Sequence, residues 1–234
     1  MKVTLLVPTL NEIVGMRQVM PRIKREWADQ VLVVDGNSTD GTAEYAHQMG
    51  YDVIVQKAKG IRHAYIEAMP LAKGDMVITF SPDGNCVPEL IPQLVARMTE
   101  GYDMVIASRY YGGLKSEDDD AITAFGNWTF TKLINVLHGG RYTDAMGIYR
   151  AWRTEIFTTL DLDKEDGYAP ERLTGTVLGV EPLLSVRAAK RKLRCAEIPG
   201  PEPRRIGGER KLQVLRWGGA YLIQIFREIY HWRA

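Results

Sequence analysis

The sequence predicts an α/β fold, with a Rossmann-like, mostly parallel sheet covered by helices on both faces. Two observations predict it. Short apolar runs alternate with longer segments of helical periodicity over the first 108 residues. The runs are apolar at nearly every position, which is typical of parallel strands buried on both faces. With 234 residues and a hydrophobic content of 45%, the chain suits a single domain with a full core.

The first half of the chain supplies five strands and four helices. Each strand is an apolar run bounded by polar or turn-forming residues. The predicted strands are residues 2–9, 30–36, 51–56, 75–80 and 103–108. The predicted helices between them are residues 11–27, 41–50, 61–72 and 88–100, with Asn11 as the first cap and Gly50 as a stop.

The second half of the chain is less regular. A polar, glycine-rich loop follows residue 109, and an irregular basic loop occupies residues 199–208. Between them we expect an amphipathic helix that ends at Gly139 and Gly140, and a late strand at 193–199. A closing helix is predicted over 209–232, weakened by its two adjacent glycines.

The charge of the chain is nearly balanced in total but uneven along the sequence. A net charge of +1 gives no electrostatic support for binding nucleic acid. Residues 181–234 carry 12 Lys or Arg against 5 Asp or Glu, a net charge of +7, whereas residues 1–180 carry −6. The basic end predicts an anionic partner, with a solvated helix face as the alternative.

Cysteine content and hydropathy point to the cytoplasm. Cys86 and Cys195 form neither a metal-binding cluster nor a disulfide framework, which favours a reducing compartment. The first apolar run is too short for a signal peptide, and no uncharged stretch approaches the roughly 18–20 residues of a membrane span. The sequence therefore predicts a soluble or peripheral protein.

Three predicted strands end in distinctive polar groups, at residues 8–12, 35–42 and 81–85. In open α/β sheets, ligands bind beyond the carboxyl ends of the strands, so these groups are expected on one rim. Asp35 is expected to bind ligand, and Asp40 to cap a helix. Because neither G-x-G-x-x-G nor G-x-x-x-x-G-K-[ST] is present, a nucleotide must be held by strand-end carboxylates and a metal.

Six motifs carry a resemblance to a known family. In order along the chain they are VPTLNE, VVDGNSTDGT, KGIRHAYIEA, FSPDGNCVPELIP, ASRYYGG and DAMGIYRAWRTEIF. Together they resemble glycosyltransferase family 2, and most closely its dolichyl- and polyprenyl-phosphate sugar synthases. The resemblance implies a GT-A fold, a GDP- or UDP-linked sugar donor, a divalent cation and inversion at the anomeric carbon. We expect a GT-A catalytic domain over 1–200, with 201–234 as a basic loop and amphipathic helix appended to the same domain.

The resemblance implies a metal site at the end of the fourth strand. Where relatives have Asp-x-Asp followed by Gln, this chain has Ser81, Asp83 and Asn85. Asp83 and Asn85 are thus the expected ligands of Mg²⁺ or Mn²⁺, ions that prefer oxygen and keep several waters. Ser81 removes a charge, so we expect weaker metal binding without nucleotide. The alternative is a capped turn.

The donor is expected to contact residues from several strand ends. Arg62 is interpreted as a nucleobase contact, with a surface arginine as the alternative. In the basic segment 204–212, Arg205 and Lys211 match family positions and are expected to close on phosphates. The remaining predicted donor contacts are Pro8, Leu10, Glu12, Asp35, Lys59, Ser81 and Pro82.

Three residues are predicted to act in catalysis, namely Asp144, Arg109 and Arg205. Arg109 is expected to bind a phosphate, with a structural pair to a carboxylate as the alternative. Asp144 is interpreted either as a general base or as a group that positions acceptor or donor sugar. Tyr149 and Arg150 are expected to serve packing and structural pairing. Glu181 matches a family Glu that heads a late helix, with simple capping as the alternative.

The resemblance and the cationic end favour a polyprenyl phosphate acceptor. Such an acceptor brings an ionised oxygen, since the second pKa of a phosphate monoester is about 6. Two alternatives are a hydroxyl acceptor and a non-catalytic nucleotide-sugar binder. The last helix is interpreted either as packed, on its own domain or a twin subunit, or as interfacial at a cytoplasmic membrane surface. A monomer and a homo-oligomer both remain open.

Overall fold

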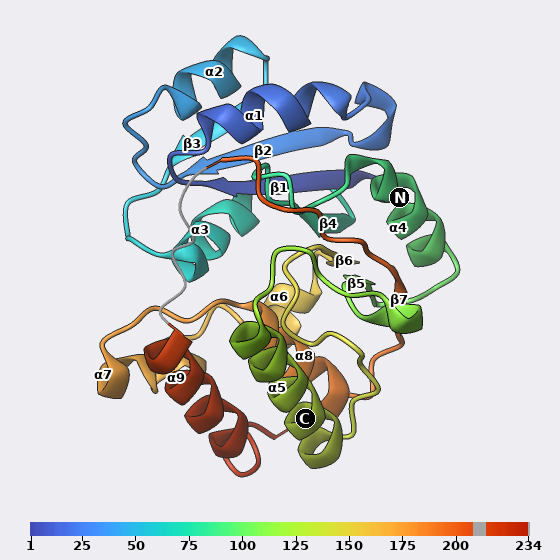
Figure 1. The fold of residues 1–234 in the computed structure, drawn as a ribbon, viewed down its shortest axis with the longest axis vertical. Helices are drawn as coiled ribbons and strands as arrows, with labels where there is room; N and C mark the ends of the chain where they lie inside the picture. Colours follow the sequence, from blue (N-terminus) through green and yellow to red (C-terminus); the bar gives the residue numbers. More distant parts are fainter. Residues whose placement is uncertain (208–213, 234) are drawn as a thin grey trace.

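The structure is a computed structural model that describes residues 1–207 and 214–233. Its described residues form one seven-stranded sheet in the order β3-β2-β1-β4-β6-β5-β7, which crosses the middle of the molecule with helices on both sides (Figure 1). The strands are β1 Val3–Thr9, β2 Gln30–Asp35, β3 Asp52–Val55, β4 Met76–Thr79, β5 Met104–Ser108, β6 Arg150–Arg153 and β7 Cys195–Pro199. The predicted α/β fold with a mostly parallel sheet is confirmed.

The predicted helices occur in the predicted order, and the short helices α6 and α7 are additional to them. They are α1 Ile13–Val19, α2 Thr42–Gln48, α3 Ile61–Ala68, α4 Ile91–Thr99, α5 Ala121–His138, α6 Ile156–Thr159, α7 Glu171–Thr174, α8 Glu181–Lys190 and α9 Val214–Arg227. Short 3-10 turns are η1 Met20–Arg22, η2 Arg25–Trp27, η3 Met69–Leu71, η4 Pro88–Leu90, η5 Tyr111–Gly113 and η6 Glu165–Tyr168. Of the predicted closing helix, residues 209–213 lie outside the described residues.

The prediction of one helix over 11–27 capped by Asn11 is wrong. Asn11 has a φ of +56°, and Glu12 is the residue that precedes the first turn of α1. The helix ends at Val19 and passes into η1, which contains Pro21. Proline lacks the backbone N–H that an α-helix needs at this position, so the α-helix ends and the chain continues as a short 3-10 turn.

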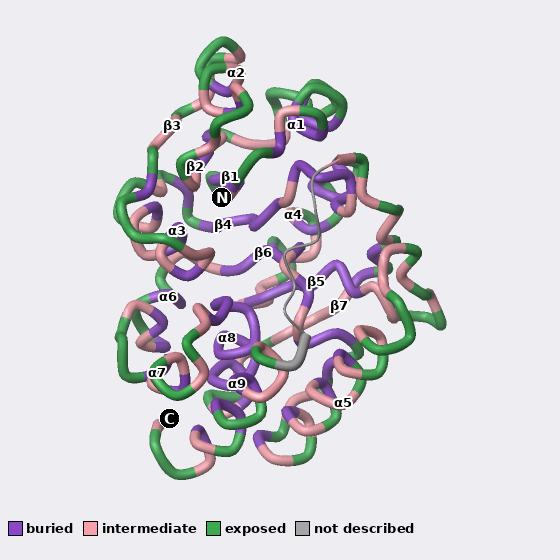
Figure 2. Tube along the Cα trace, turned by 60° about the vertical axis from the view of Figure 1, so that its left-hand side comes forward, coloured by how far each residue is buried: buried purple, intermediate pink, exposed green. Residues whose placement is uncertain are grey.

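The strands are buried on both faces because their alternate side chains enter two separate cores. Leu5 and Val7 of β1 pack in a core with α1, α2 and α4, whereas Leu6 packs in the core beneath α3, α5 and α8. In Figure 2 the central strands β1, β4 and β5 are drawn almost entirely as buried, whereas the edge strands β3 and β7 are mostly intermediate or exposed. This arrangement explains why the strands are apolar at nearly every position.

One strand, β6, runs antiparallel to both of its neighbours, β4 and β5. It was not predicted, because a four-residue strand with arginine at both ends does not read as an apolar run. Its direction has a topological effect. The loop that precedes β6, residues 139–149, reaches the same rim at which the parallel strands end.

Candidate functional site

The turn after β4 is the centre of the rim. Asp83 is only 3% exposed, and its Oδ1 accepts a hydrogen bond from the backbone N–H of Asn85 at 3.1 Å. Gly84 lies between them with a φ of +96°, a conformation that favours glycine. A Cβ at Gly15 of α1 would lie 2.3 Å from the Pro82 carbonyl oxygen. Helix α1 therefore holds the turn at close range.

Residues 200–207, which we call the strap, cross over this turn. The backbone N–H of Ile206 donates to the Asp83 carbonyl oxygen at 2.7 Å, and the Asn85 side-chain amide donates to the Pro203 carbonyl oxygen at 2.8 Å. The Arg205 guanidinium forms an ion pair with the Asp83 carboxylate at 2.8 Å. The strap thus brings together Arg205 and Asp83, which are far apart in the sequence.

The polar segment at the end of β2 contributes two carboxylates to structure. Asp35 is 1% exposed and accepts hydrogen bonds from the Ser38 N–H at 2.8 Å and the Thr9 hydroxyl at 3.3 Å. Asp40 accepts from the N–H groups of Ile13 and Thr42, both at 3.0 Å. The structural role predicted for Asp40 is confirmed, whereas the ligand role of Asp35 stays a prediction.

The other predicted donor contacts are distributed along the rim. Pro8 is the penultimate residue of β1, and Leu10 follows that strand with 38% exposure. Ser81 and Pro82 lie in the Asp83 turn. Lys59 is exposed before α3. Lys211 lies outside the described residues, and contact of any of these residues with a donor remains a prediction.

Arg62 is not a surface arginine, so that alternative is wrong. Its side chain is 2% exposed and pairs with Glu165 at 2.7 Å and Glu171 at 2.8 Å. The guanidinium also lies 4.5 Å from the ring centre of Tyr168. Carboxylates from a distant segment explain why an arginine can be buried here. Its nucleobase role remains a prediction.

Arg109 and Asp144 form the second cluster of the site. The Asp144 carboxylate is fully buried and accepts from Arg109 Nε at 2.6 Å and Nη2 at 3.0 Å. It also accepts from the N–H groups of Met146 and Gly147. Burial alone would raise the pKa of Asp144, but the Arg109 charge and hydrogen bonds outweigh it and lower that pKa. The structural pair that was the alternative for Arg109 is therefore present.

The residues that complete the surroundings of Arg109 were not predicted from the sequence. Asp119 lies 3.3 Å from its Nη1, Glu202 of the strap lies 3.5 Å away, and Asn127 Oδ1 accepts from its Nη2 at 3.1 Å. Burial raises the pKa of Glu202, against the opposing charge of Arg109. The acidic run at 117–120 was the available signal for Asp119, but its position beside Arg109 follows only from the fold.

The Asp144→Asn variant is expected to lose about 1.5–3 kcal/mol of unfolding free energy at pH 7, because a charged hydrogen bond to Arg109 becomes a neutral one. A lowered native pKa gives stability that is present above the unfolded pKa of about 3.9 and is lost as the pH falls through the native pKa. The difference in unfolding free energy between variant and wild type should therefore become smaller as the pH is lowered. Urea unfolding at several pH values measures it, and a difference independent of pH would contradict an ionised Asp144.

Residues predicted for packing and capping lie where expected. Tyr149 is 6% exposed and its ring meets that of Phe80 edge-on at 5.5 Å. Arg150 is fully buried and donates to the Gly147 carbonyl oxygen and to Ser185 Oγ. Glu181 begins α8. The packing roles of Tyr149 and Arg150 are confirmed.

The Asp83 turn suits a cation that arrives with ligands of its own. The described residues contain no cluster of three or more His, Cys, Asp or Glu able to hold a metal. The turn nevertheless offers the Asp83 carboxylate and the Asn85 amide oxygen, and a cationic group, Arg205, already lies on Asp83. A hard ion such as Mg²⁺ accepts one or two protein oxygens if a substrate phosphate and water supply the rest.

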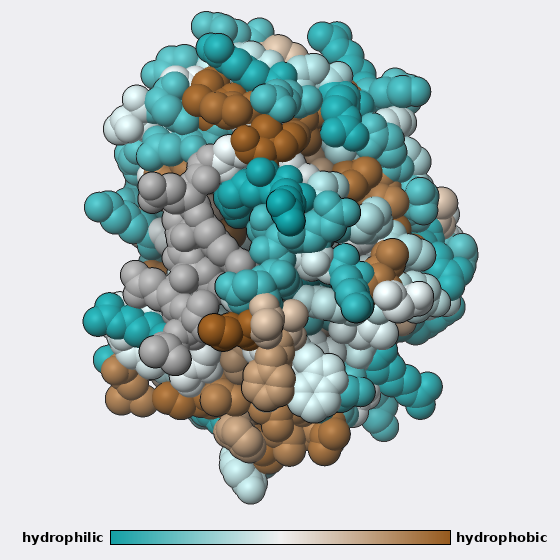
Figure 3. All heavy atoms as spheres, viewed as in Figure 1, coloured by the Kyte–Doolittle hydropathy of each residue, from teal (hydrophilic) through white to brown (hydrophobic). Residues whose placement is uncertain are grey.

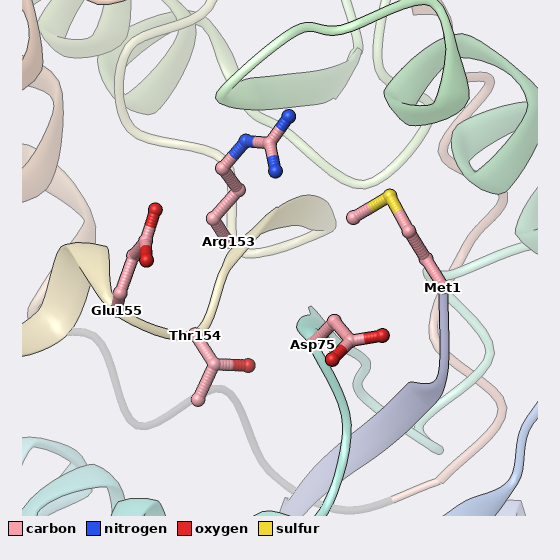
Figure 4. A pocket seen from close by; sticks show the side chains of 5 residues that line it. All are labelled: Met1, Asp75, Arg153, Thr154 and Glu155. Carbon is pink, nitrogen blue, oxygen red and sulfur yellow. The ribbon is translucent and has the colours of Figure 1, made fainter.

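A separate hollow of about 410 Å³ lies at the ends of the strands that face away from the rim (Figure 4). It is bordered by Met1, Asp75, Arg153, Thr154 and Glu155. Asp75 accepts from the Lys2 N–H, and Arg153 pairs with Asp103, so its main charges are engaged. Asp75 immediately precedes β4 and Thr154 immediately follows β6, so the hollow lies at the end of these strands that is opposite the rim.

Comparisons with solved structures identify the fold. Glucosyl-3-phosphoglycerate synthase of Mycobacterium tuberculosis in complex with UDP matches with a TM-score of 0.69 and 18% identity, over 97% of this chain and 80% of that one. The same enzyme with Mn²⁺, UDP and phosphoglyceric acid matches with a TM-score of 0.68 and 19% identity, over 98% and 78%. The fold is GT-A.

Comparisons of sequence identify the family. The glycosyltransferase AglJ of Haloferax volcanii is 30% identical over 96% of this chain and 71% of that protein. The undecaprenyl-phosphate mannosyltransferase of Micrococcus luteus is 28% identical over 93% and 94%, and the dolichol-phosphate mannosyltransferase of Pyrococcus furiosus 28% over 98% and 63%. The family profile for Glycosyl transferase family 2 matches residues 4–161. The chain therefore belongs to glycosyltransferase family 2.

Proposed function

We propose that this protein transfers a sugar from a nucleoside diphosphate sugar to a polyprenyl phosphate, with inversion at the anomeric carbon. The observation that carries the proposal is the arrangement at the carboxyl rim, where buried Asp83 faces the basic strap. Solved relatives of the same fold bind UDP with Mn²⁺ or Mg²⁺. We infer that the donor, GDP- or UDP-linked, binds at this rim.

The chemistry assigned to this site is a single in-line displacement. An acceptor oxygen attacks the anomeric carbon from the face opposite the diphosphate, and the bond from that carbon to the diphosphate oxygen breaks. A divalent ion, when bound by Asp83 and Asn85, would neutralise charge on the departing diphosphate. Arg205 and Lys211 would contribute further positive charge to the same oxygens.

The burial of Asp144 favours a phosphate over a hydroxyl as acceptor. A general base must reach the proton that it removes, yet this carboxylate is fully buried and accepts hydrogen bonds from Arg109 and two backbone N–H groups. A phosphate monoester is already ionised near neutral pH and needs no strong base. Asp144 is therefore assigned the role of holding Arg109, which would orient a phosphate group.

A lipid acceptor is supported by the outer faces of α5 and α9. On α5, Ile122, Phe125 and Trp128 are 56–67% exposed, and on α9 Ile223 and Phe226 are 40% and 48% exposed. Apolar residues gather at the lower end of the molecule in Figure 3, over the region where Figure 1 draws α7 and α9. Helix α5 carries no Asp or Glu between residues 121 and 138. Such a face suits contact with an anionic membrane surface.

The described part of the chain contains no helix of the length and apolarity that a membrane crossing requires. We accordingly propose peripheral attachment at the cytoplasmic face of a membrane. Pairing of the α5 and α9 faces in a homo-oligomer is the competing use of this surface.

We expect UDP or GDP to raise the melting temperature only when Mn²⁺ is present. At a hundredfold excess over the dissociation constant the stabilisation is about 2.7 kcal/mol, which is roughly 5–10 °C for a chain of this size. The thermal shift identifies the nucleobase. A sugar nucleotide with that base and a labelled sugar is then supplied together with either polyprenyl phosphate or free polyprenol. The labelled sugar should be transferred to the polyprenyl phosphate and not to the polyprenol.

Two results would overturn parts of the proposal. Transfer to the polyprenol as readily as to its phosphate would contradict the acceptor. Binding of nucleotide with neither hydrolysis nor transfer would support the non-catalytic binder instead.

A further inference from the structure

Arg205 lies where a metal ion would have to contact Asp83. Its Nη2 is 2.8 Å from Asp83 Oδ2, and its Nη1 is 3.4 Å from Glu12 Oε1. The Asp83 side chain is 5% exposed, so the ion pair is largely shielded from water. A guanidinium and a divalent cation cannot both occupy the same face of one carboxylate.

The backbone around Arg205 is fixed on both sides. Ile206 donates to the Asp83 carbonyl oxygen at 2.7 Å, and the Arg205 N–H donates to Asp118 Oδ1 at 3.2 Å. The Ile206 side chain also packs against Gly84, where an added Cβ would lie 2.6 Å away. Because the strap backbone is anchored in this way, Arg205 can change its partner by moving only its side chain.

The guanidinium is incompletely satisfied in this position. Its Nε is buried and has no hydrogen-bond partner among residues 1–207 and 214–233. A buried donor without a partner is destabilising, because it has lost its hydrogen bond to water. A diphosphate offers several oxygens to the planar fork of an arginine, so it can satisfy the N–H groups that Asp83 and Glu12 leave unused.

We propose that Arg205 occupies the cation position at Asp83 while no nucleotide is bound, and that it moves to the diphosphate when donor and divalent ion arrive together. This inference rests on the proposed function. The exchange leaves Asp83 with a positive partner in both states, which matters because a buried carboxylate without one is strongly destabilised. It also explains why a single carboxylate at this turn suffices, since the divalent ion binds only together with nucleotide.

The exchange predicts that removing the Arg205 charge exposes the metal site. Binding of Mn²⁺ to the full chain without nucleotide is measured by the loss of the free-ion paramagnetic resonance signal. Arg205→Gln is expected to bind Mn²⁺ at least about tenfold more tightly than wild type, which is a difference of about 1.4 kcal/mol. The matched control is Arg204→Gln, because Arg204 is the exposed neighbour and loses the same charge. Its affinity should stay within about twofold of wild type, since screened surface charges contribute little.

The second arm adds UDP and GDP to the same samples. The affinity of the wild type for Mn²⁺ should then rise. The affinity of Arg205→Gln for Mn²⁺ should rise by a smaller factor, because the diphosphate has lost its contact with Arg205. Arg205→Lys keeps the charge without the fork, and its nucleotide-free affinity for Mn²⁺ should fall between the two. Melting curves establish that each variant is folded.

The outcomes separate this inference from the proposed function. If the nucleotide-free affinity for Mn²⁺ changes equally in Arg205→Gln and Arg204→Gln, or in neither, the exchange is overturned while the metal site at Asp83 stands. If Asp83→Asn binds Mn²⁺ and nucleotide together as wild type does, the metal site itself is wrong, and the proposed function loses its main support.

Discussion

Replacing Asp83 by Asn is expected to lower the turnover of sugar transfer by about 10²–10³-fold, the usual effect of removing one preorganised electrostatic contact in an active site. Asparagine has nearly the same shape and can still accept the hydrogen bond from the Asn85 N–H. The loss would therefore reflect the missing charge on the metal ligand rather than a changed turn. The same variant should show no Mn²⁺-dependent rise in melting temperature with UDP or GDP. Steady-state transfer and thermal shift measure the two effects.

The control for this variant is Glu89→Gln, which removes a carboxylate from the segment that follows the turn. Glu89 is exposed and pairs with Arg22 at 2.8 Å on the surface. Its replacement should leave turnover within about twofold, because exposed pairs contribute little. Equal losses in the two variants, or full turnover in Asp83→Asn, would refute a metal role for Asp83.

Replacing Arg187 by Met is expected to remove about 3–5 kcal/mol of unfolding free energy, since it leaves Glu228 as an uncompensated buried charge. Arg187 and Glu228 are 2% and 0% exposed and share two hydrogen bonds of 3.0 Å. Arg187 also donates to the carbonyl oxygens of Leu160 and Asp161. This pair holds the residues after α9 to α8. The melting temperature should fall by roughly 6–20 °C, measured by calorimetry.

Two further variants test the cause of that fall. Arg227→Gln removes an arginine whose partner, Asp166, is 63% exposed, so its cost should be at most about 1 kcal/mol. The double variant Arg187→Met and Glu228→Met should be more stable than Arg187→Met alone, because no charge is then left unpaired. A double variant that is less stable than either single one would show that packing, rather than charge, dominates at this position.

The regular part of the fold could be predicted because its signals are local. Five apolar runs and the amphipathic segment at 122–140 identify strands and helices without knowledge of their neighbours. Strand β6 and helix α8 lack such signals for opposite reasons. Strand β6 is short and carries two arginines, whereas α8 is buried around nearly its whole circumference and therefore shows no amphipathic pattern.

The candidate site could be predicted as a set of strand ends but not as a set of contacts. The sequence identifies Asp83, Arg109 and Arg205 separately. Their partners depend on segments that only the fold brings together, such as the strap that brings Arg205 to Asp83. For the same reason the sequence leaves a surface position open for Arg62 beside the nucleobase role, although Glu165 and Glu171 from beyond β6 bury it.

The reversed direction of β6 has a practical consequence for engineering this fold. Residues 139–149 enter the rim from the C-terminal half of the chain, whereas the first two polar strand ends come from the N-terminal half. Tyr142, Asp144 and Ala145 of this connection are buried, and Asp144 pairs with Arg109 after β5. A chimaera that exchanges residues 139–149 between relatives is therefore expected to fold well only if the surroundings of Arg109 are exchanged with them.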